Sequence, residues 1–308
     1  MKTFFMDTFD RKKIHVCVWD DVSVIKGCVV ISHGMAEHVE RYNDFALFLN
    51  DKGYVVVGDD HRGHKHNSAG AKGMVEGDSF FQTVRDMKDV VDMSKQKYSQ
   101  NVVLLGHSYG SFLSQRFIEL YSQDINGCIL SGTAYMISPL ISFGKKVANF
   151  QNVLFGPDKI AYFINTLSFG SYNKQFKSEG LEFAWLSRDK NQVLKYIDDE
   201  YCGYEMSLGF YKSFFKGLLA THAKERTGVR KDLPILIAVG GDDPVSNKAS
   251  LAYKLEDQYK KVNKLNKVEI KVYDGARHEI LNETNRDEVY ADFLTFIEKC
   301  TQGFQTSV

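Results

Sequence analysis

Continuous aliphatic runs alternate with amphipathic runs along most of the chain. An aliphatic run that ends in Gly, His or Asp is typical of a strand buried on both faces of a parallel sheet. Such runs occupy 26–34, 53–60, 102–107, 127–133 and 233–241, and KVEIKVYDGA (267–276) is a further predicted strand. KIHVCVWD (13–20) alternates as a half-buried strand does, and 4–9 can pair with it. Helical spacing covers 39–53, 80–98, a run to about 122 that follows the strand at 102–107, and about 286–300.

The alternation of strands and helices predicts an α/β fold with a mostly parallel central sheet and helices on both faces. The alternation stops at 134–226, a stretch of helical composition that carries 18 of the chain's 40 aromatic residues. A small helical layer needs aromatic residues for its own thin core, but the excess favours an apolar surface held over something. We therefore expect a core of 1–133 and 227–308 with an inserted helical cap at 134–226.

Composition excludes several classes of protein. Lys and Arg total 39, as do Asp and Glu, so the formal net charge is zero and nothing points to nucleic acid. No apolar run approaches the roughly 20 residues of a membrane span, and the first residues do not read as a signal peptide. The five cysteines are scattered, which favours free thiols in a reducing compartment. We expect a cytoplasmic protein of undetermined oligomeric state.

The stretch VVLLGHSYGS (102–111) places Ser108 between two glycines, where a predicted strand meets a predicted helix. Gly and Ser are common in ordinary turns. The pattern G-x-S-x-G, however, also forms a tight elbow that exposes a serine oxygen as a nucleophile. We therefore take Ser108 as the candidate nucleophile and ask whether the rest of the chain supplies its partners.

A serine nucleophile needs a histidine base and a carboxylate that fixes the histidine tautomer. In hydrolases built on this elbow, the order along the chain is Ser, then Asp or Glu, then His. LPILIAVGGDDP ends one predicted strand with Asp242 and Asp243, and His278 follows the next strand. A lone Asp or His in such a loop is usually turn chemistry. Three residues in the required order favour a catalytic set of Ser108, Asp243 and His278.

An attack on a carbonyl group also requires hydrogen-bond donors for the oxyanion that develops. One donor should be the backbone N–H of Tyr109, directly after the nucleophile. The other should come from the loop after an early strand, where ISHGMAEH (31–38) offers the N–H of Met35. Because both donors are backbone groups, bulky side chains at these positions are compatible with the role.

Five motifs occur in this order and span about residues 27–283: HGMAEHVERY, DHRGHKHNS, LGHSYGS, GGDDP and RHEILNE. Together they resemble the monoacylglycerol lipase and lysophospholipase branch of the α/β-hydrolase fold. The resemblance implies Ser108 as nucleophile, Asp243 as acid, His278 as base, and Met35 and Tyr109 as oxyanion donors. It also implies a variable helical cap where the alternation stops.

Three positions depart from the family pattern. Tyr109 and Ser111 stand where the family often has Met and Gly, and Lys65 stands where Gly commonly follows the arginine–glycine–histidine motif. In the GGDDP loop the family places the acid directly before proline, which favours Asp243, so that Asp242 shapes the turn. The first two departures adjoin the nucleophile and can reshape the acyl pocket.

Two other sets of residues invite a functional reading. His61, His64 and His66 form a cluster that could bind zinc, but two of the three lie inside a structural motif of the family, so we predict no metal. Glu37 and His38 could act as an acid–base pair. Their place beside the oxyanion loop instead predicts that they brace it.

The resemblance implies a serine hydrolase that cleaves esters of single-chain lipids, such as monoacylglycerols or lysophospholipids, without a cofactor. A serine aminopeptidase that clips N-terminal residues is the alternative, because related sequences share most of the motifs. Such an enzyme needs acidic groups for the substrate's ammonium, and 198–200 is an acidic run, although such a run usually faces solvent. A non-catalytic ligand-binding protein on the same fold is a third possibility. Head group and acyl length stay open.

Overall fold

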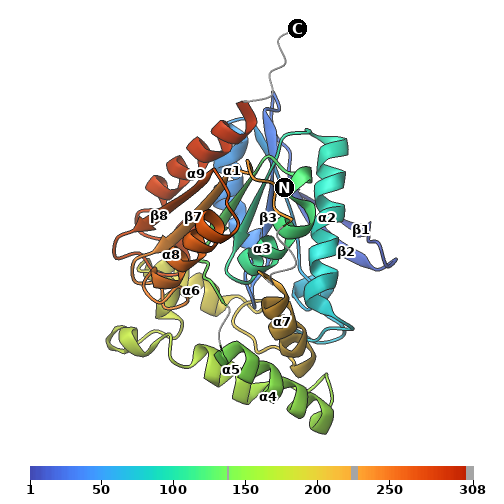
Figure 1. The fold of residues 1–308 in the computed structure, drawn as a ribbon, viewed down its shortest axis with the longest axis vertical. Helices are drawn as coiled ribbons and strands as arrows, with labels where there is room; N and C mark the ends of the chain where they lie inside the picture. The colour runs from blue at the N-terminus through green and yellow to red at the C-terminus, as the bar shows by residue number, and fades with distance from the viewer. Residues whose placement is uncertain (137–138, 223–227, 303–308) are drawn as a thin grey trace.

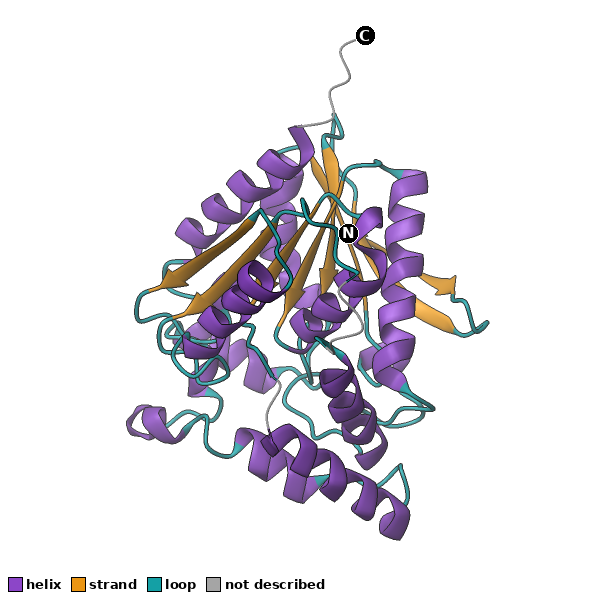
Figure 2. Ribbon diagram, viewed as in Figure 1, coloured by secondary structure: helices purple, strands orange, loops and turns teal. Residues whose placement is uncertain are grey.

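The computed structural model describes residues 1–136, 139–222 and 228–302, and its centre is one eight-stranded sheet (Figures 1 and 2). The strand order is β1-β2-β4-β3-β5-β6-β7-β8. β1 and β2 pair antiparallel, as do β2 and β4, and all the other pairs are parallel. The strands are β1 Lys2–Asp7, β2 Lys13–Trp19, β3 Gly27–Ser32, β4 Tyr54–Asp59, β5 Val102–His107, β6 Gly127–Ser131, β7 Ile235–Gly240 and β8 Val268–Tyr273. The predicted α/β fold is confirmed.

Helices cover both faces of the sheet, as the aliphatic strands require. They are α1 Asn43–Asp51, α2 Ser79–Lys97, α3 Tyr109–Tyr121, α8 Ser250–Asp257 and α9 Arg286–Thr301. Successive strand residues point to opposite faces, so Val29 packs in the hydrophobic cluster of α1 and α9, and Val30 in that of α2 and α3. Among the described residues no helix is both long and apolar enough to cross a membrane.

Two expectations from the sequence were wrong in detail. β2 is buried from Ile14 to Trp19 and is not half-buried. Its Val16 packs with the α2 side of the core and its Trp19 with the α1 and α9 side, so both faces are covered. The expected helix at 39–53 begins as a separate 3₁₀ turn, Val39–Tyr42, and the α-helix starts only at Asn43.

Within the described residues, the segment between β6 and β7 contains four α-helices: α4 Pro139–Phe155, α5 Tyr162–Phe169, α6 Lys190–Asp198 and α7 Leu208–Ala220. α4 packs against α7, and α7 packs against α2 of the core. Figure 1 shows α4 and α5 as a separate layer on the far side of α7 from the sheet. We call residues 134–226 the cap. Residues 137–138 and 223–227, at its predicted limits, lie outside the described residues, and the division into core and cap stays a prediction.

Candidate active site

Ser108 occupies a strained turn between β5 and α3. Its backbone angles, φ 52° and ψ −117°, lie in a region that non-glycine residues rarely adopt. The two flanking glycines have no room for a side chain. A Cβ at Gly106 would lie 2.5 Å from the backbone carbonyl oxygen of Gly110, and a Cβ at Gly110 would lie 2.0 Å from the backbone carbonyl oxygen of Ser32. The close crossing of α3 over β5 and the end of β3 therefore explains both glycines of G-x-S-x-G, and it leaves Ser108 at the tip of the turn.

The structure brings Asp243 and His278 together at the ends of β7 and β8. The Nδ1 atom of His278 is 3.0 Å from Oδ1 of Asp243, and both side chains are buried. Asp242, the competing acid, has a side chain that is 44% exposed and pairs with Lys248 at 3.6 Å. Because the Asp243 carboxylate accepts a hydrogen bond at Nδ1, the proton of a neutral His278 belongs on Nδ1, which leaves Nε2 free to accept one.

The Nε2 atom of His278 is buried and has no hydrogen-bond partner among the described residues. It shares a cavity with Ser108, and a bound substrate could bring the two side chains into contact. The imidazole lies between the rings of Trp185 and His107, with centroids 5.0 and 4.8 Å away. Burial lowers the pKa of His278, but the Asp243 carboxylate opposes this, and the net pKa lies above its ordinary value. Burial also lowers the pKa of His107 to about 3, so His107 is neutral.

The two candidate oxyanion donors flank Ser108. Met35 and Tyr109 both line a cavity that Ser108 also lines. Within the described residues, neither backbone N–H donates a hydrogen bond. The Tyr109 ring is buried against Phe210 and Phe214, with centroid distances of 5.1 and 5.5 Å. The site thus accommodates Tyr where the family often has Met by packing the ring against aromatic side chains of α7.

A buried ionic network braces the loop that carries Met35. The Glu37 carboxylate accepts hydrogen bonds from the Gly34 N–H, from the Tyr42 hydroxyl at 2.9 Å and from Arg41 at 2.6 Å. Arg41 also forms two hydrogen bonds of 2.7 Å with Glu279, next to His278. Burial raises the pKa of Glu279, but the Arg41 guanidinium outweighs it, and the net pKa lies below its ordinary value. The predicted bracing role of Glu37 agrees with these contacts.

Sequence reasoning missed Arg41 and Glu279, which are 238 positions apart. The one available signal was that each is charged and lies inside a family motif, HGMAEHVERY and RHEILNE respectively. Charged residues at such positions are usually exposed. Only the three-dimensional structure shows that the two side chains join the oxyanion loop to the loop of the candidate base.

The cap contacts the same loop through His38. The Nε2 atom of His38 is 2.8 Å from the Asp199 carboxylate of the cap. The Ala36 carbonyl oxygen accepts hydrogen bonds of 3.0 Å from the Tyr196 hydroxyl and from the Gly203 N–H. The acidic run at 198–200 therefore does not lie wholly in solvent, because Asp199 is held against the core.

Lys65 replaces the glycine that commonly follows the arginine–glycine–histidine motif in the family, and its backbone keeps a glycine-like conformation. Its φ is +39°, in the left-handed region that glycine adopts readily and bulky residues rarely adopt. The side chain pairs with Glu40 at 2.7 Å. The early loop thus tolerates a lysine because the ion pair offsets part of the backbone strain.

The three histidines considered for a metal do not gather into one site. His61 and His64 hydrogen-bond to Asp59 and to the Arg62 carbonyl, respectively. Among the described residues only His66 of the three belongs to a group of possible ligands, with His15 and Asp60. The Nδ1 atom of His15 already lies 2.9 Å from the Asp60 carboxylate. The hydrogen bond to Asp60 therefore occupies Nδ1 of His15, and the burial of both side chains needs no ion to explain it.

Two cavities of different character meet at Ser108. One has a volume of about 270 Å³, is lined mainly by apolar side chains of α4, α5 and α7, and extends from Ser108. The other has a volume of about 340 Å³ and more polar walls, which include Asn165, Glu182 and Glu205 together with His278. Met35 and Ser108 line both cavities. A scissile bond at Ser108 would therefore have an apolar side and a polar side.

Comparisons with known proteins agree with this geometry. A family model described as serine aminopeptidase, S33 (Hydrolase_4) matches residues 23–285. A monoglyceride lipase homolog of Monkeypox virus is 29% identical over 97% of this chain and 97% of its own length. The monoglyceride lipase of Rattus norvegicus is 28% identical over 86% of this chain and 79% of its own length. A carboxyl esterase from Bacillus coagulans superposes with a TM-score of 0.87 over 97% of this chain and 98% of its own, at 23% identity.

The fold and these matches define an α/β-hydrolase of the carboxylic ester hydrolase class, as the sequence predicted. Within that class, the chain belongs to the Hydrolase_4 family.

Proposed function

We propose that this protein hydrolyses esters of single-chain lipids, with monoacylglycerols or lysophospholipids as the substrate class, through an acyl-enzyme on Ser108. The observation that carries the proposal is the position of Ser108 at the junction of an apolar and a more polar cavity. A lipid with one chain has the matching polarity: a long apolar acyl group on one side of the ester and a compact polar alcohol on the other. The two relatives named for monoglyceride lipase support the glycerol ester in particular.

In the proposed mechanism, the Ser108 oxygen attacks the ester carbonyl carbon while its proton moves to Nε2 of His278. The N–H groups of Met35 and Tyr109 stabilise the negative charge on the carbonyl oxygen. The tetrahedral intermediate then collapses, and the alcohol leaves with the proton from His278. Water repeats the sequence on the acyl-enzyme and releases the fatty acid. Asp243 orients His278 and stabilises its charged form.

The cap supplies the acyl side of the site in this proposal. Side chains of α4, α5 and α7 line the apolar cavity, among them Leu140, Ile141, Val147, Leu167, Phe214 and Phe215. The outer surface of α4 and α5 is also apolar: nine large apolar side chains are between 51% exposed (Leu167) and 89% exposed (Val153). Leu140 and Leu167 belong to both sets, so the cavity opens beside this surface. An apolar opening favours a lipid over a water-soluble ester.

We also propose that residues 134–226 act as a cap domain over the catalytic core, and that the protein is cytoplasmic. The packing of α4 and α7 over the Ser108 cavity supports the first statement. All five cysteines are free, which suits a reducing compartment and supports the second.

An N-terminal peptidase is the second candidate, because the family description names an aminopeptidase and because Glu182 and Glu205 line the polar cavity. A substrate ammonium would need such carboxylates. Both side chains are exposed at the cavity, and Asp199 of the acidic run pairs with His38. Binding the free N-terminus of a peptide would not require the apolar cavity beside Ser108. These observations favour the lipid ester.

One experiment separates the candidates. The purified protein is assayed with monoacylglycerols, lysophospholipids, short-chain esters and aminoacyl amides under one set of conditions. We expect the highest kcat/KM with the single-chain lipid esters. A higher kcat/KM with aminoacyl amides would establish the peptidase, and a failure to hydrolyse any of them would establish a non-catalytic ligand-binding role.

A further inference from the structure

A second Ser–His–Asp series lies beneath the candidate active site. The Oγ atom of Ser32 is 2.8 Å from Nε2 of His61, and Nδ1 of His61 is 3.1 Å from Oδ2 of Asp59. The exposed fractions of the three residues are 0%, 0% and 1%. None of the three lines either cavity at Ser108. Ser32 therefore does not meet a substrate, and the series needs another explanation than nucleophilic chemistry.

The hydrogen bonds determine what each group contributes. A carboxylate only accepts, so Nδ1 of His61 carries a proton and donates it to Asp59. In the neutral ring, Nε2 then accepts the Ser32 hydroxyl proton. Both ring nitrogens of His61 are thus used, and the ring orientation fixes the position of the Ser32 side chain at the end of β3.

Ser32 and His33 lie directly against the start of α3. A Cβ at Gly110 would lie 2.0 Å from the backbone carbonyl oxygen of Ser32 and 2.5 Å from that of His33. The Gly110 carbonyl oxygen, 3.3 Å from the Ser32 hydroxyl, is a longer alternative acceptor for the same hydroxyl proton. Gly110 directly follows Tyr109, and Met35 is two residues beyond His33. The contact between β3 and α3 therefore sets how far apart the Met35 and Tyr109 N–H groups lie.

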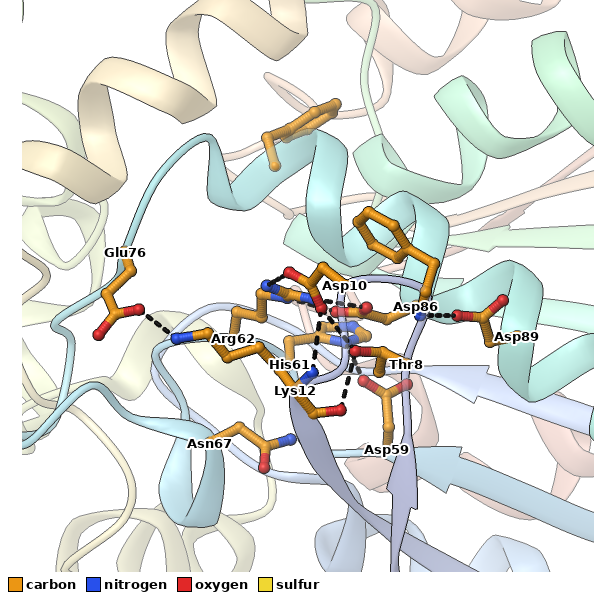
Figure 3. A network of polar contacts seen from close by, with 12 residues as sticks. Thr8, Asp10, Lys12, Asp59, His61, Arg62, Asn67, Glu76, Asp86 and Asp89 are labelled. Atoms are coloured by element: carbon orange, nitrogen blue, oxygen red, sulfur yellow. Dashed lines mark hydrogen bonds and ion pairs between the residues drawn. The ribbon is translucent and has the colours of Figure 1, made fainter.

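The loop that carries His61 is itself anchored. Arg62 forms two hydrogen bonds with Asp86, at 2.6 and 2.8 Å, and two with Asp10, at 2.7 and 2.9 Å. Figure 3 shows Arg62 between these two carboxylates, next to His61 and Asp59. The backbone N–H of His61 also donates a hydrogen bond of 2.9 Å to Nε2 of His33, and the two imidazole rings stack with their centroids 4.1 Å apart. These contacts hold His61 in one place relative to the sheet.

We propose that His61, oriented by Asp59, is a positioning residue: through Ser32 it sets the spacing between the two oxyanion donors. The proposal rests on the proposed function, in which the Met35 and Tyr109 N–H groups bind the oxyanion. A donor displaced by about 1 Å can lower the rate about 100-fold. Loss of the His61–Ser32 contact should therefore lower kcat and leave KM nearly unchanged, because only the transition state carries the oxyanion charge.

The test compares His61→Asn, His61→Gln and Ser32→Ala. An Asn side chain ends near the Nδ1 position, so it keeps the Asp59 contact and loses Ser32, whereas a Gln side chain reaches the Nε2 position. We expect kcat to fall about 10- to 100-fold for His61→Asn and for Ser32→Ala, which both remove the His61–Ser32 contact, and less for His61→Gln, with KM within about twofold. His15→Gln is the matched control, because His15 is also buried and pairs with Asp60 but has no contact with Ser32.

A second readout separates positioning from general damage. A long-chain trifluoromethyl ketone adds reversibly to Ser108 and forms an oxyanion, whereas a non-hydrolysable ether analogue of the lipid binds without one. We expect His61→Asn to weaken the ketone in parallel with kcat/KM and to leave ether binding unchanged. Loss of a buried hydrogen bond should lower the melting temperature, so both ligands are compared at a temperature well below the melting transition of each variant. If His61→Asn fails to fold, Ser32→Ala carries the same test.

Three results would overturn the proposal: an unchanged kcat, a parallel loss of ether binding and ketone binding, or an equal loss in His15→Gln. Failure of the proposed function has a different signature, since the wild-type protein itself would then hydrolyse no ester and would not react at Ser108.

Discussion

The core and the cap contribute different side chains to the region around Ser108. Core loops bring buried charged groups that are paired, such as Glu37 with Arg41 and Asp243 with His278. The cap brings walls to both cavities: apolar side chains of α4, α5 and α7 in one, and polar side chains such as Asn165 and Glu205 in the other. In the proposed function, we expect a division of labour in which the core sets the rate of bond cleavage and the cap ranks the substrates. Variants of the core should then slow all substrates alike, and variants of the cap should reorder them.

The largest expected effect is that of Ser108→Ala. We expect the variant to lose about 10⁴-fold or more in kcat with every ester. Binding of a non-hydrolysable ether lipid should be retained, because the cap supplies the apolar cavity. A fluorophosphonate probe followed by peptide mass spectrometry should label Ser108 in the wild-type protein and nothing in the variant. Labelling at another residue, or residual turnover in the variant, would show that the nucleophile was assigned wrongly.

The second-largest effect should be that of Asp243→Asn. We expect a loss of about 10³- to 10⁴-fold in kcat, since an amide favours the wrong tautomer of His278. Asp242→Asn is the matched control one position away. Its side chain is 44% exposed, and its ion pair within the described part of the chain is with Lys248, so we expect less than a twofold change. Steady-state kinetics with one short and one long ester measures both. Equal losses in the two variants, or losses confined to the long ester, would contradict the division between core and cap.

The pH dependence should show one acid limb. His278 must be neutral to accept the Ser108 proton, and the Asp243 carboxylate, against the effect of burial, raises its pKa. The protonated, inactive form therefore persists to a higher pH than for an ordinary histidine. We expect kcat/KM to fall about tenfold per pH unit on the acid side, with a midpoint above about 6.5. Melting temperatures across the same range provide the control for unfolding. A profile that is flat down to pH 5 would exclude His278 as the base.

Val147→Phe in the cap should change selectivity more than rate. Val147 lines the apolar cavity from α4. A larger side chain there should shorten the best acyl chain by a few carbons and change the turnover of acetate esters less than twofold. Val153→Phe is the control on the same helix, because Val153 is 89% exposed. A chain-length profile shifted equally by both variants would show that the cavity is not the acyl site.

The sequence was sufficient for the parts of this molecule that depend on local patterns. Aliphatic runs predicted β3, β4, β5, β6 and β7, since a strand buried on both faces must be apolar throughout. The expected proximity of Ser108, Asp243 and His278 likewise follows from strands that end at one edge of a parallel sheet, and their order along the chain follows the pattern of hydrolases built on the serine elbow. The proline after Asp243 selected the residue that the structure places against His278.

Features that depend on distant pairs could not be predicted. β2 seemed half-buried because its alternation includes His15, whose polar atom is satisfied by Asp60 from another strand end. The Arg41–Glu279 pair and the Ser32–His61–Asp59 series involve charged or polar side chains that composition assigns to the surface. Their burial becomes favourable only when each partner is in place, and a single sequence does not reveal partners.

The acyl-chain profile of the wild-type protein tests the central claim most directly. Specificity constants are measured for p-nitrophenyl esters from acetate upward. Each methylene buried in the apolar cavity contributes up to about 0.8 kcal/mol, which is about a fourfold gain in kcat/KM per carbon. We predict a rise over successive carbons that stops once the chain fills the cavity of about 270 Å³. A profile that is flat, or highest for acetate, would contradict the assignment of the cap cavity to a lipid chain.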